Sequence, residues 1–339
     1  TLEDEAAAAI GFTYTETDAA TILVTGLVQG TSELTIPATL HGLPVTAIAE
    51  NAFAYETALT SVFLPGSIST VPQNAFRGCN ALESVTLDDG ITKLNNDCFA
   101  ECTSLSVIHL PESLEYIGSG ALRNTAITQL HLPSSVSLIA SDAVNACEQL
   151  AAITVEEGNE YYASDDGVLY DLIDDKLVRY PAQRAGDSYT VVDGTCVIGS
   201  YAFQNASLET IHLSESVWSL EEAAFAGCSK LSALPSPMSA LLTTIPSKAF
   251  AGCRSLKDII IPDSIVRIEA GAFASCTGLE SVTIPAGVTA LNGTVFSNPN
   301  IIVYGKTGST TETYAIANHL IFVDPDASAL PRASRARGY

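Results

Sequence analysis

The sequence predicts an extended repeat solenoid, mainly β or α/β, in which about ten coils of about 23 residues share a continuous parallel sheet. Three observations support this fold class. An Ala-Phe pair or a close variant recurs every 22 to 25 residues, apart from one longer gap. Short segments of alternating apolar residues follow the pair. Hydrophobic residues make up 47% of the 339 residues and charged residues only 16%, so a large core can form.

The Phe of the recurring pair, which we call the anchor, marks the position of each coil. Leu and Val replace it in two coils, and apolar residues precede it by eight and five positions, as Ile68 and Val71 precede Phe76. The anchors are Phe53, Phe76, Phe99, Leu122, Val144, Phe203, Phe225, Phe250, Phe273 and Phe296. Because one coil of this size cannot bury its own apolar face, we expect equivalent residues of successive coils to stack.

Each anchor is followed by a predicted strand of pattern L-x-x-I-x-I. Examples are "LTSVFLP" from Leu59 and "LKDIIIP" from Leu256. Alternating apolar positions rich in β-branched residues indicate strands, and the closing proline ends each one because it cannot donate the next ladder hydrogen bond. Strands at equivalent places should form a parallel sheet with a spacing of about 4.8 Å.

The combined consensus, L-x-x-I-x-I-P-x-S-V-x-x-I-x-x-x-A-F-x-x-C, resembles the BspA-like leucine-rich repeats of bacterial surface proteins. The resemblance covers roughly residues 34–323. It implies a leucine-rich repeat solenoid with a hairpin island between coils, a cap at the C-terminal end, and an extracellular or bacterial cell-surface location. The family is specific as to fold and unspecific as to activity.

The positions at which the repeat begins, is interrupted and ends predict the domain organisation. Within the 59-residue gap between Val144 and Phe203, "GVLYDLIDDKLVRYP" predicts two strands that turn near Asp174 and Asp175. Two prolines in "LPSPMSA" should bulge a later connection. The expected parts are an N-terminal cap with a short helix and a hairpin at 1–33, repeats at 34–155, the island at 156–193, repeats at 194–298, a C-terminal cap at 299–324 and a flexible tail at 325–339.

The C-terminal cap contains a helix signal. Ser309 and Glu312 have the spacing of a capping box, which predicts a helix over 310–317. Asn318 suits a left-handed residue after that helix. The helix should cover the last coil, because an open sheet edge would pair with other chains.

The net charge of −23, from 38 acidic and 15 basic residues, argues against two classes of partner. Such a surface repels nucleic acid and anionic lipid. No apolar run approaches the 18 to 20 residues or so of a membrane span, so we expect no membrane insertion.

Six of the eight cysteines lie three residues after an anchor. Zinc ligands must converge on one point, whereas cysteines one coil apart form a line. In-register stacking also holds the side chains parallel, unlike the turned geometry of a disulfide. We therefore expect buried free thiols that pack as small hydrophobic groups. Cys196 is outside the pattern and is the predicted exposed thiol.

The candidate partner-binding site is the middle exposed position of each strand, which we call the sheet row. Its predicted members are Phe63, Thr86, His109, His131, Thr154, His212, Ile260 and Thr283. His109 and His131 would be close enough to share a metal ion, but their neighbours are poor third ligands, so we expect no metal and no other cofactor. The exposed sheet face of a solenoid is where partners usually bind.

Motifs for catalysis or calcium binding are absent from the sequence. It has no G-x-S-x-G, H-E-x-x-H, P-loop or GxGxxG, and "SDDG" and "LDDG" do not fit a calcium loop. A glycosidase carboxylate pair is not excluded by acid count alone, but the acids occupy variable surface positions. We therefore expect a protein without catalytic activity.

The predicted function is binding at the cell surface or outside the cell, through protein–protein interaction or adhesion. A carbohydrate-binding module is an alternative, for which Trp218, Tyr161 and Tyr162 are candidate stacking residues. Only Phe63 gives the sheet row an aromatic ring, which argues against that alternative. A structural spacer is the other alternative, and the sequence leaves the partner and the oligomeric state open.

Overall fold

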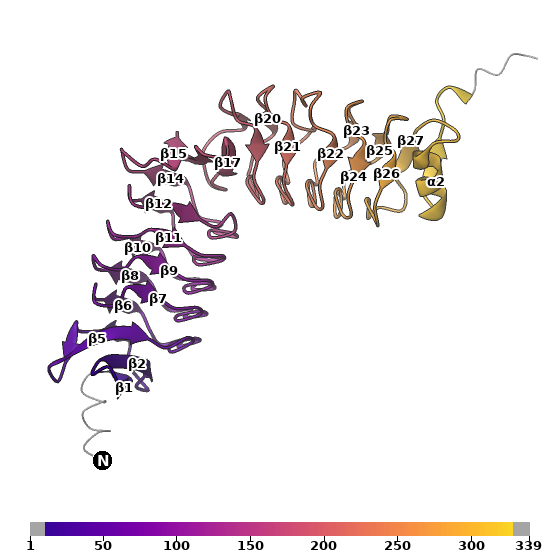
Figure 1. The fold of residues 1–339 in the computed structure, drawn as a ribbon. Coiled ribbons are helices and arrows are strands. Elements are labelled where there is room, and N and C mark those ends of the chain that lie inside the picture. Colours follow the sequence, from indigo (N-terminus) through magenta and orange to yellow (C-terminus); the bar gives the residue numbers. More distant parts are fainter. Residues whose placement is uncertain (1–10, 328–339) are drawn as a thin grey trace, which may run out of the picture. The chain divides into compact units, whose positions relative to one another are not determined.

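The computed structural model describes residues 11–327, and the chain forms a mainly-β solenoid of about 13 turns. The fold class is the predicted one, whereas the number of turns exceeds the ten or so coils expected from the anchors. The solenoid divides into two compact units (Figure 1): Thr1–Gly186 with Val197–Ala206, and Asp187–Cys196 with Ser207–Tyr339. The helix expected near the N-terminus and most of the expected flexible tail lie outside the described residues.

The first unit begins with an antiparallel pair of strands and continues as stacked coils. The initial strands are β1 (Phe12–Glu16), β2 (Ile22–Leu27), β4 (Thr39–Leu40) and β5 (Leu43–Ile48). The coil strands are β3 (Glu33–Thr35), β6 (Ser61–Leu64), β8 (Ser84–Leu87), β10 (Val107–His109), β12 (Gln129–Leu132) and β14 (Ala152–Val155). Their pairing is parallel from β3 to β10 and again from β12 to β14, with the ladder interrupted between β10 and β12.

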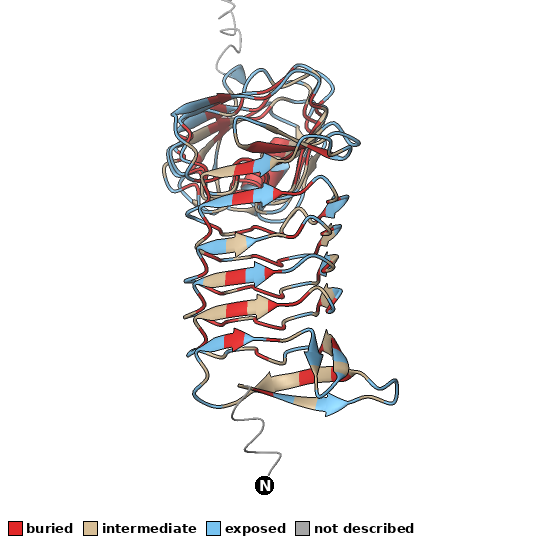
Figure 2. Ribbon diagram, turned by 90° about the vertical axis from the view of Figure 1, so that its left-hand side faces the viewer, coloured by how far each residue is buried: buried red, intermediate tan, exposed pale blue. Residues whose placement is uncertain are grey.

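Each coil also contributes a two-residue strand on another side, and these short strands pair in parallel with one another. In the first unit these strands are β7 (Thr70–Val71), β9 (Lys93–Leu94), β11 (Tyr116–Ile117) and β13 (Leu138–Ile139). They contain the apolar residue five positions before each anchor, and these residues are buried. Figure 2 shows how buried residues alternate with exposed ones along the stacked strands.

The anchors form stacked aromatic columns inside each unit. Ring centroids are 4.9 Å apart for Phe53 and Phe76, and 5.4 Å apart for Phe250 and Phe273. The rings are nearly parallel, which repetition at one-coil intervals imposes on equivalent side chains. All ten anchors are buried, so each coil supplies core area that only its neighbours can cover.

The predicted island contains three antiparallel strands. They are β15 (Tyr162–Asp165), β16 (Val168–Asp171) and β17 (Lys176–Arg179). The turn between β16 and β17 includes Asp175 with a left-handed φ of 47°, close to the predicted turn. The island boundaries at 156 and 193 stay a prediction.

One end of the island belongs to the coil stack, which the sequence analysis missed. β17 pairs in parallel with β19 (Val197–Ile198). The Tyr180 ring stacks on Phe203 with centroids 5.3 Å apart. Tyr180 therefore holds the anchor position of an additional coil, one repeat length before Phe203.

A buried arginine fills the place where the regular coil-to-coil bonds are lost beside the island. Arg179 is 2% exposed. Its guanidinium donates to the side-chain oxygen of Asn145 and to the carbonyl oxygens of Val144 and Tyr201, over 2.8 to 3.3 Å. These bonds tie the loop around Val144 to the coil of Tyr201 and give the buried guanidinium hydrogen-bond acceptors.

The second unit repeats the same architecture. Its coil strands are β18 (Ser188–Thr190), β20 (Thr210–His212), β23 (Asp258–Ile260), β25 (Ser281–Thr283), β27 (Ile302–Tyr304) and β28 (Ile321–Val323). The short strands are β21 (Ser219–Leu220), β22 (Thr244–Ile245), β24 (Arg267–Ile268) and β26 (Ala290–Leu291). Parallel pairing joins β18 to β20, β22 to β24 to β26, and β23 through β25 and β27 to β28.

The helix α2 (Thr310–Ala317) confirms the predicted range and the Ser309 cap, whose side chain accepts from the backbone N–H of Glu312. The Glu312 carboxylate accepts from the N–H of Gly308. The prediction for Asn318 was wrong: it has a φ of −103°, and His319 takes the left-handed conformation with a φ of 57°. The Asn318 side chain instead donates to the carbonyl of Tyr314.

The helix α2 covers the end of the aromatic column, as the sequence analysis predicts for the C-terminal cap. The Tyr314 ring meets Phe296 edge-on, with centroids 6.3 Å apart. The Tyr314 hydroxyl accepts a hydrogen bond from the backbone N–H of Val295 over 2.8 Å. The last coil is thereby covered by an apolar ring whose polar group satisfies a buried donor.

Candidate functional site

The structure places the predicted sheet-row residues of the first unit in register on adjacent strands. Phe63 pairs with Thr86, and Thr86 pairs with His109. His131 pairs with Thr154 on the next sheet. All are exposed except Phe63, which is half-buried. The buried residues on either side, such as Val85 and Leu87, hold the strand and so fix the direction of the row.

The sheet row of the second unit has the same register. Ile260 pairs with Thr283, and His212 forms an isolated bridge with Ser236. The strongest apolar exposure in the row is at Ile260, which is 74% exposed. Four row positions were missed by the sequence analysis: Thr190, Ser236, Tyr304 and Val323. Tyr304 and Val323 follow the same alternation of apolar and exposed residues, which was a usable signal.

Polar contacts within the row join neighbouring coils. The Nδ1 of His131 and the hydroxyl of Thr154 are hydrogen-bonded, 3.0 Å apart. Beside the row, the Ser281 hydroxyl donates to the Asp258 carboxylate over 2.6 Å. Residues 11–327 contain no group of three or more His, Cys, Asp or Glu side chains that could hold a metal ion.

The repeat cysteines are buried as the sequence predicts, whereas Cys196, predicted to be exposed, is half-buried. All eight are free, and all except the half-buried Cys196 are buried. Five of the thiols donate to the carbonyl oxygen of the anchor one coil earlier: Cys79, Cys102, Cys147, Cys253 and Cys276. Burial raises the pKa of Cys276 to about 12, which disfavours the thiolate that nucleophilic or metal-binding chemistry needs.

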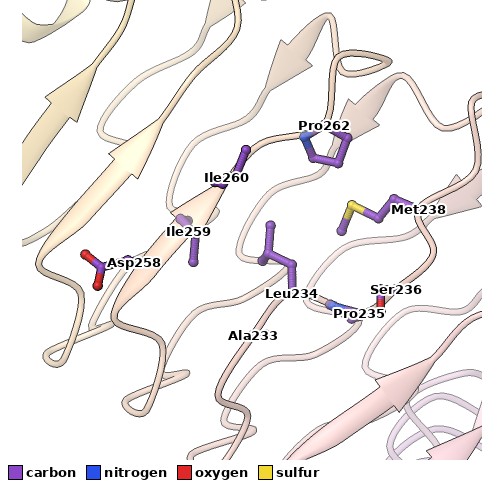
Figure 3. A pocket seen from close by; sticks show the side chains of 9 residues that line it. All are labelled: Ala233, Leu234, Pro235, Ser236, Met238, Asp258, Ile259, Ile260 and Pro262. Carbon is purple, nitrogen blue, oxygen red and sulfur yellow. The ribbon is translucent and has the colours of Figure 1, made fainter. Parts of the chain in front are cut away.

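A hollow of about 320 Å³ opens on the sheet face of the second unit beside Ile260 (Figure 3). Leu234 and Met238 line it from one coil, and Ile260 and Pro262 line it from the next. The expected bulge in "LPSPMSA" therefore leaves an open apolar surface.

The candidate stacking residues lie away from the sheet row. Trp218 is 53% exposed and precedes β21, on the short-strand side of its coil. Tyr161 is exposed, whereas Tyr162 is buried and its hydroxyl accepts from the N–H of Ile139. Burial raises the pKa of Tyr162. The structure therefore places Trp218 outside the sheet row of its own unit and Tyr162 in the core of the first unit.

The family of the chain follows from comparison with known proteins. A family model described as the BspA type leucine rich repeat region, in six copies, matches residues 31–161 and 196–319. The chain belongs to this family. The two matched ranges leave out β15, β16 and β17 of the island.

Solved structures resemble this BspA-type chain over most of its length. A leucine rich cell surface protein from Faecalibacterium prausnitzii is 28% identical, with a TM-score of 0.61, and the match covers 85% of this chain and 93% of that one. The pneumococcal vaccine antigen PcpA is 22% identical, with a TM-score of 0.71 and coverage of 92% and 96%. A leucine-rich repeat protein from Eubacterium ventriosum is 18% identical, with a TM-score of 0.59 and coverage of 83% and 84%.

At 22% and 18% identity, the similarities to PcpA and to the Eubacterium ventriosum protein show the fold alone. Comparison with curated protein sequences gives no match. Within residues 11–327, none of the helices combines the length and the apolar character needed to cross a membrane.

Proposed function

We propose that this chain is an extracellular or bacterial cell-surface protein that binds protein partners through the sheet row and has no catalytic role. The observation that carries the proposal is the register of the row. Exposed side chains of different chemistry repeat at one-coil intervals, and in most of these strands the neighbouring apolar residues, such as Val62, Val85 and Leu130, are buried. The name of the Faecalibacterium prausnitzii relative supports the location.

The row suits binding because its backbone is already ordered. Thr86 and His109 are fixed by parallel pairing, and the anchors behind them stack at about 5 Å. A partner that docks on such a surface loses little additional backbone entropy from this side of the interface. The net charge of −23 favours partners with basic surfaces.

A binding screen with one set of row variants tests the proposal. The chain is measured by surface plasmon resonance against immobilised extracellular-matrix proteins and, separately, on a glycan array. The row variant carries Thr86→Ala, His109→Ala and His131→Ala. The matched control carries Lys93→Ala, Glu115→Ala and Ser137→Ala, which are exposed positions in β9 or directly before β11 and β13.

We expect binding to at least one matrix protein, weakened about tenfold or more by the row variant and less than about twofold by the control. Binding that is equal for the row variant and the chain would contradict the role of the row. Binding to glycans alone would favour the carbohydrate-binding alternative, and binding to neither panel would favour a spacer.

A further inference from the structure

The hollow beside Ile260 exists because the sheet ladder is broken at one junction within the second unit. In the other coils of this unit, the residue after a row residue donates its N–H to the row carbonyl of the next coil. This bond is made by Leu213 to Ser236, by Ile261 to Thr283 and by Ile284 to Tyr304, over 2.9 to 3.1 Å. The equivalent donor to Ile260 would be Pro237, which has no N–H.

Pro235 removes a second donor from the same edge. Among residues 11–327, no backbone hydrogen bond joins the segment 233–238 to β23. β23 is consequently an edge strand in the middle of a coil stack, and β21 likewise makes no strand pair with β22. Phe225 still stacks on Phe250 and donates its backbone N–H to the carbonyl of Ala249, so the coils stay joined through the core and open at the sheet face.

The opening is apolar at its centre and acidic at one end. Leu234 and Met238 face Ile260 and Pro262 across it (Figure 3). Asp258 is the single charged residue among the nine that line the hollow. It lies two residues before Ile260, so both side chains project on the same face of β23.

The volume and the flexibility of the lining limit what the hollow can hold. About 320 Å³ is at the small end of the range of about 300 to 1,000 Å³ for ligand pockets, so it suits one large side chain and not a whole domain edge. Met238 has an unbranched thioether side chain that adapts to rings and aliphatic groups. The exposed edge of β23 offers main-chain groups to an extended segment.

We propose that the hollow binds an extended segment of a protein partner, which inserts one aromatic or aliphatic side chain and places a basic side chain, two residues away, beside Asp258. Charge complementarity selects this occupant, since the chain carries a net charge of −23 and the only charge in the lining is a carboxylate. The inference rests on the proposed function, because it names the partner chemistry for the same sheet face.

The chain offers a direct spectroscopic reporter of this site. Met238 is its only methionine. Labelling with ε-¹³CH₃-methionine therefore gives one resonance from the chain, located in the hollow. The probe is a capped hexapeptide, TRTFTT, in which Arg and Phe share one face of an extended strand. The control peptides are TRTATT and TETFTT.

We expect TRTFTT to shift the Met238 methyl resonance saturably, with a Kd of about 1 mM or below, and both control peptides to bind at least about fivefold more weakly. Ile260→Thr, which gives the position a residue common in the row, should weaken TRTFTT binding at least fivefold. Asp258→Asn should weaken TRTFTT binding and remove its advantage over TETFTT. Val266→Thr, at an exposed apolar position outside the hollow, is the matched control and should leave binding unchanged.

Several results would overturn the proposal. These are an unmoved resonance, equal shifts with TRTFTT and TRTATT, or an advantage of TRTFTT that persists in Asp258→Asn. A shift that depends on protein concentration without peptide would assign the hollow to a second copy of the chain. A saturable shift with maltohexaose and none with peptide would assign it to a sugar.

The two proposals fail separately. Matrix binding that depends on Thr86, His109 and His131, with an unmoved Met238 resonance, would retain the function and reject the hollow. A peptide response that depends on Ile260 and Asp258, without binding to any matrix protein, would retain the hollow as a peptide site and reject the proposed function.

Discussion

The thiol of Cys276 donates a hydrogen bond to the carbonyl oxygen of Phe250 in the preceding coil, with Sγ and O 3.1 Å apart. The same bond joins Cys253 to Phe225 and Cys102 to Phe76. A cysteine at this position thus fills a small apolar space and also satisfies a buried carbonyl. The repeated cysteines are structural groups of the coil.

The first prediction concerns thiol reactivity. We expect one thiol, that of Cys196, to react with a disulfide reagent such as DTNB in the folded chain at pH 8, and the seven buried thiols to react only after unfolding. Cys196→Ser should abolish labelling of the folded chain. Rapid labelling of two or more thiols without denaturant would contradict the structural role.

The second prediction concerns the aromatic column. Phe250→Ala should lower the free energy of unfolding by about 3 to 5 kcal/mol, because it removes a buried ring and leaves a cavity between Phe225 and Phe273. Urea denaturation measures this loss. Trp218→Ala, at an exposed position of the same unit, should change it by less than about 0.5 kcal/mol. Similar losses for the two variants would refute the column as the main source of core stability.

The third prediction concerns the island junction. Arg179→Met keeps much of the side-chain volume but removes three hydrogen bonds, so we expect a loss of about 3 kcal/mol or more. Amide hydrogen exchange should accelerate around Asn145 and Tyr201. Arg254→Met, at an exposed position, is the matched control. Unchanged exchange at both sites would show that the buried guanidinium does not join them.

The fourth prediction concerns acid conditions. The Asp324 carboxylate accepts hydrogen bonds from the hydroxyl and from the backbone N–H of Thr307. These bonds, of which the one from the hydroxyl has the larger effect, lower the pKa of Asp324 to about 2. The folded-state pKa lies below the ordinary value of 3.8. The carboxylate therefore stabilises the cap fully above pH 3.8, and this contribution is lost as the pH falls towards 2.

NMR titration of the Asp324 carboxyl carbon measures this pKa. Thr307→Ala keeps the backbone donor and removes the hydroxyl, so the pKa should rise towards its ordinary value. Titration of the unchanged chain near pH 3.8 would be inconsistent with these hydrogen bonds.

The periodic parts of the fold were predictable because each repeated residue has the same surroundings in every coil. The anchors, the row register and the α2 range all follow from spacing. Arg179 was not predictable, since its role depends on acceptors in the loop around Val144 and at Tyr201 that are brought together only where the island interrupts the coils. Tyr180 was hidden because "YP" replaces the usual Ala-Phe pair, although its distance from Phe203 is one repeat length.

The candidate site was predictable only in part. Alternation identified the exposed row, but Ser236 was omitted because the prolines around it disturb the strand pattern. The hollow could be found only from the three-dimensional structure, since it depends on the position of Pro237 opposite the carbonyl group of Ile260. Asn318 was assigned the left-handed conformation from residue preference, whereas its side chain bonds to Tyr314 and the chain reverses one residue later.

Because of the missing hydrogen bonds at Pro235 and Pro237, the junctions between neighbouring coils of the second unit differ in their resistance to force. From β23 to β26, each coil is held to the next by the sheet ladder, the short strands and the core column. The junction between 207–236 and 241–323 lacks the ladder bonds to β23 and has no pairing of β21 with β22, so of these connections it retains only the stacking of Phe225 on Phe250 and the backbone hydrogen bonds beside that column. In a chain of nearest-neighbour couplings, the weakest junction separates first. Under a pulling force applied at its ends, the second unit should part here into two segments, 207–236 and 241–323, each of which then unfolds as a cooperative block.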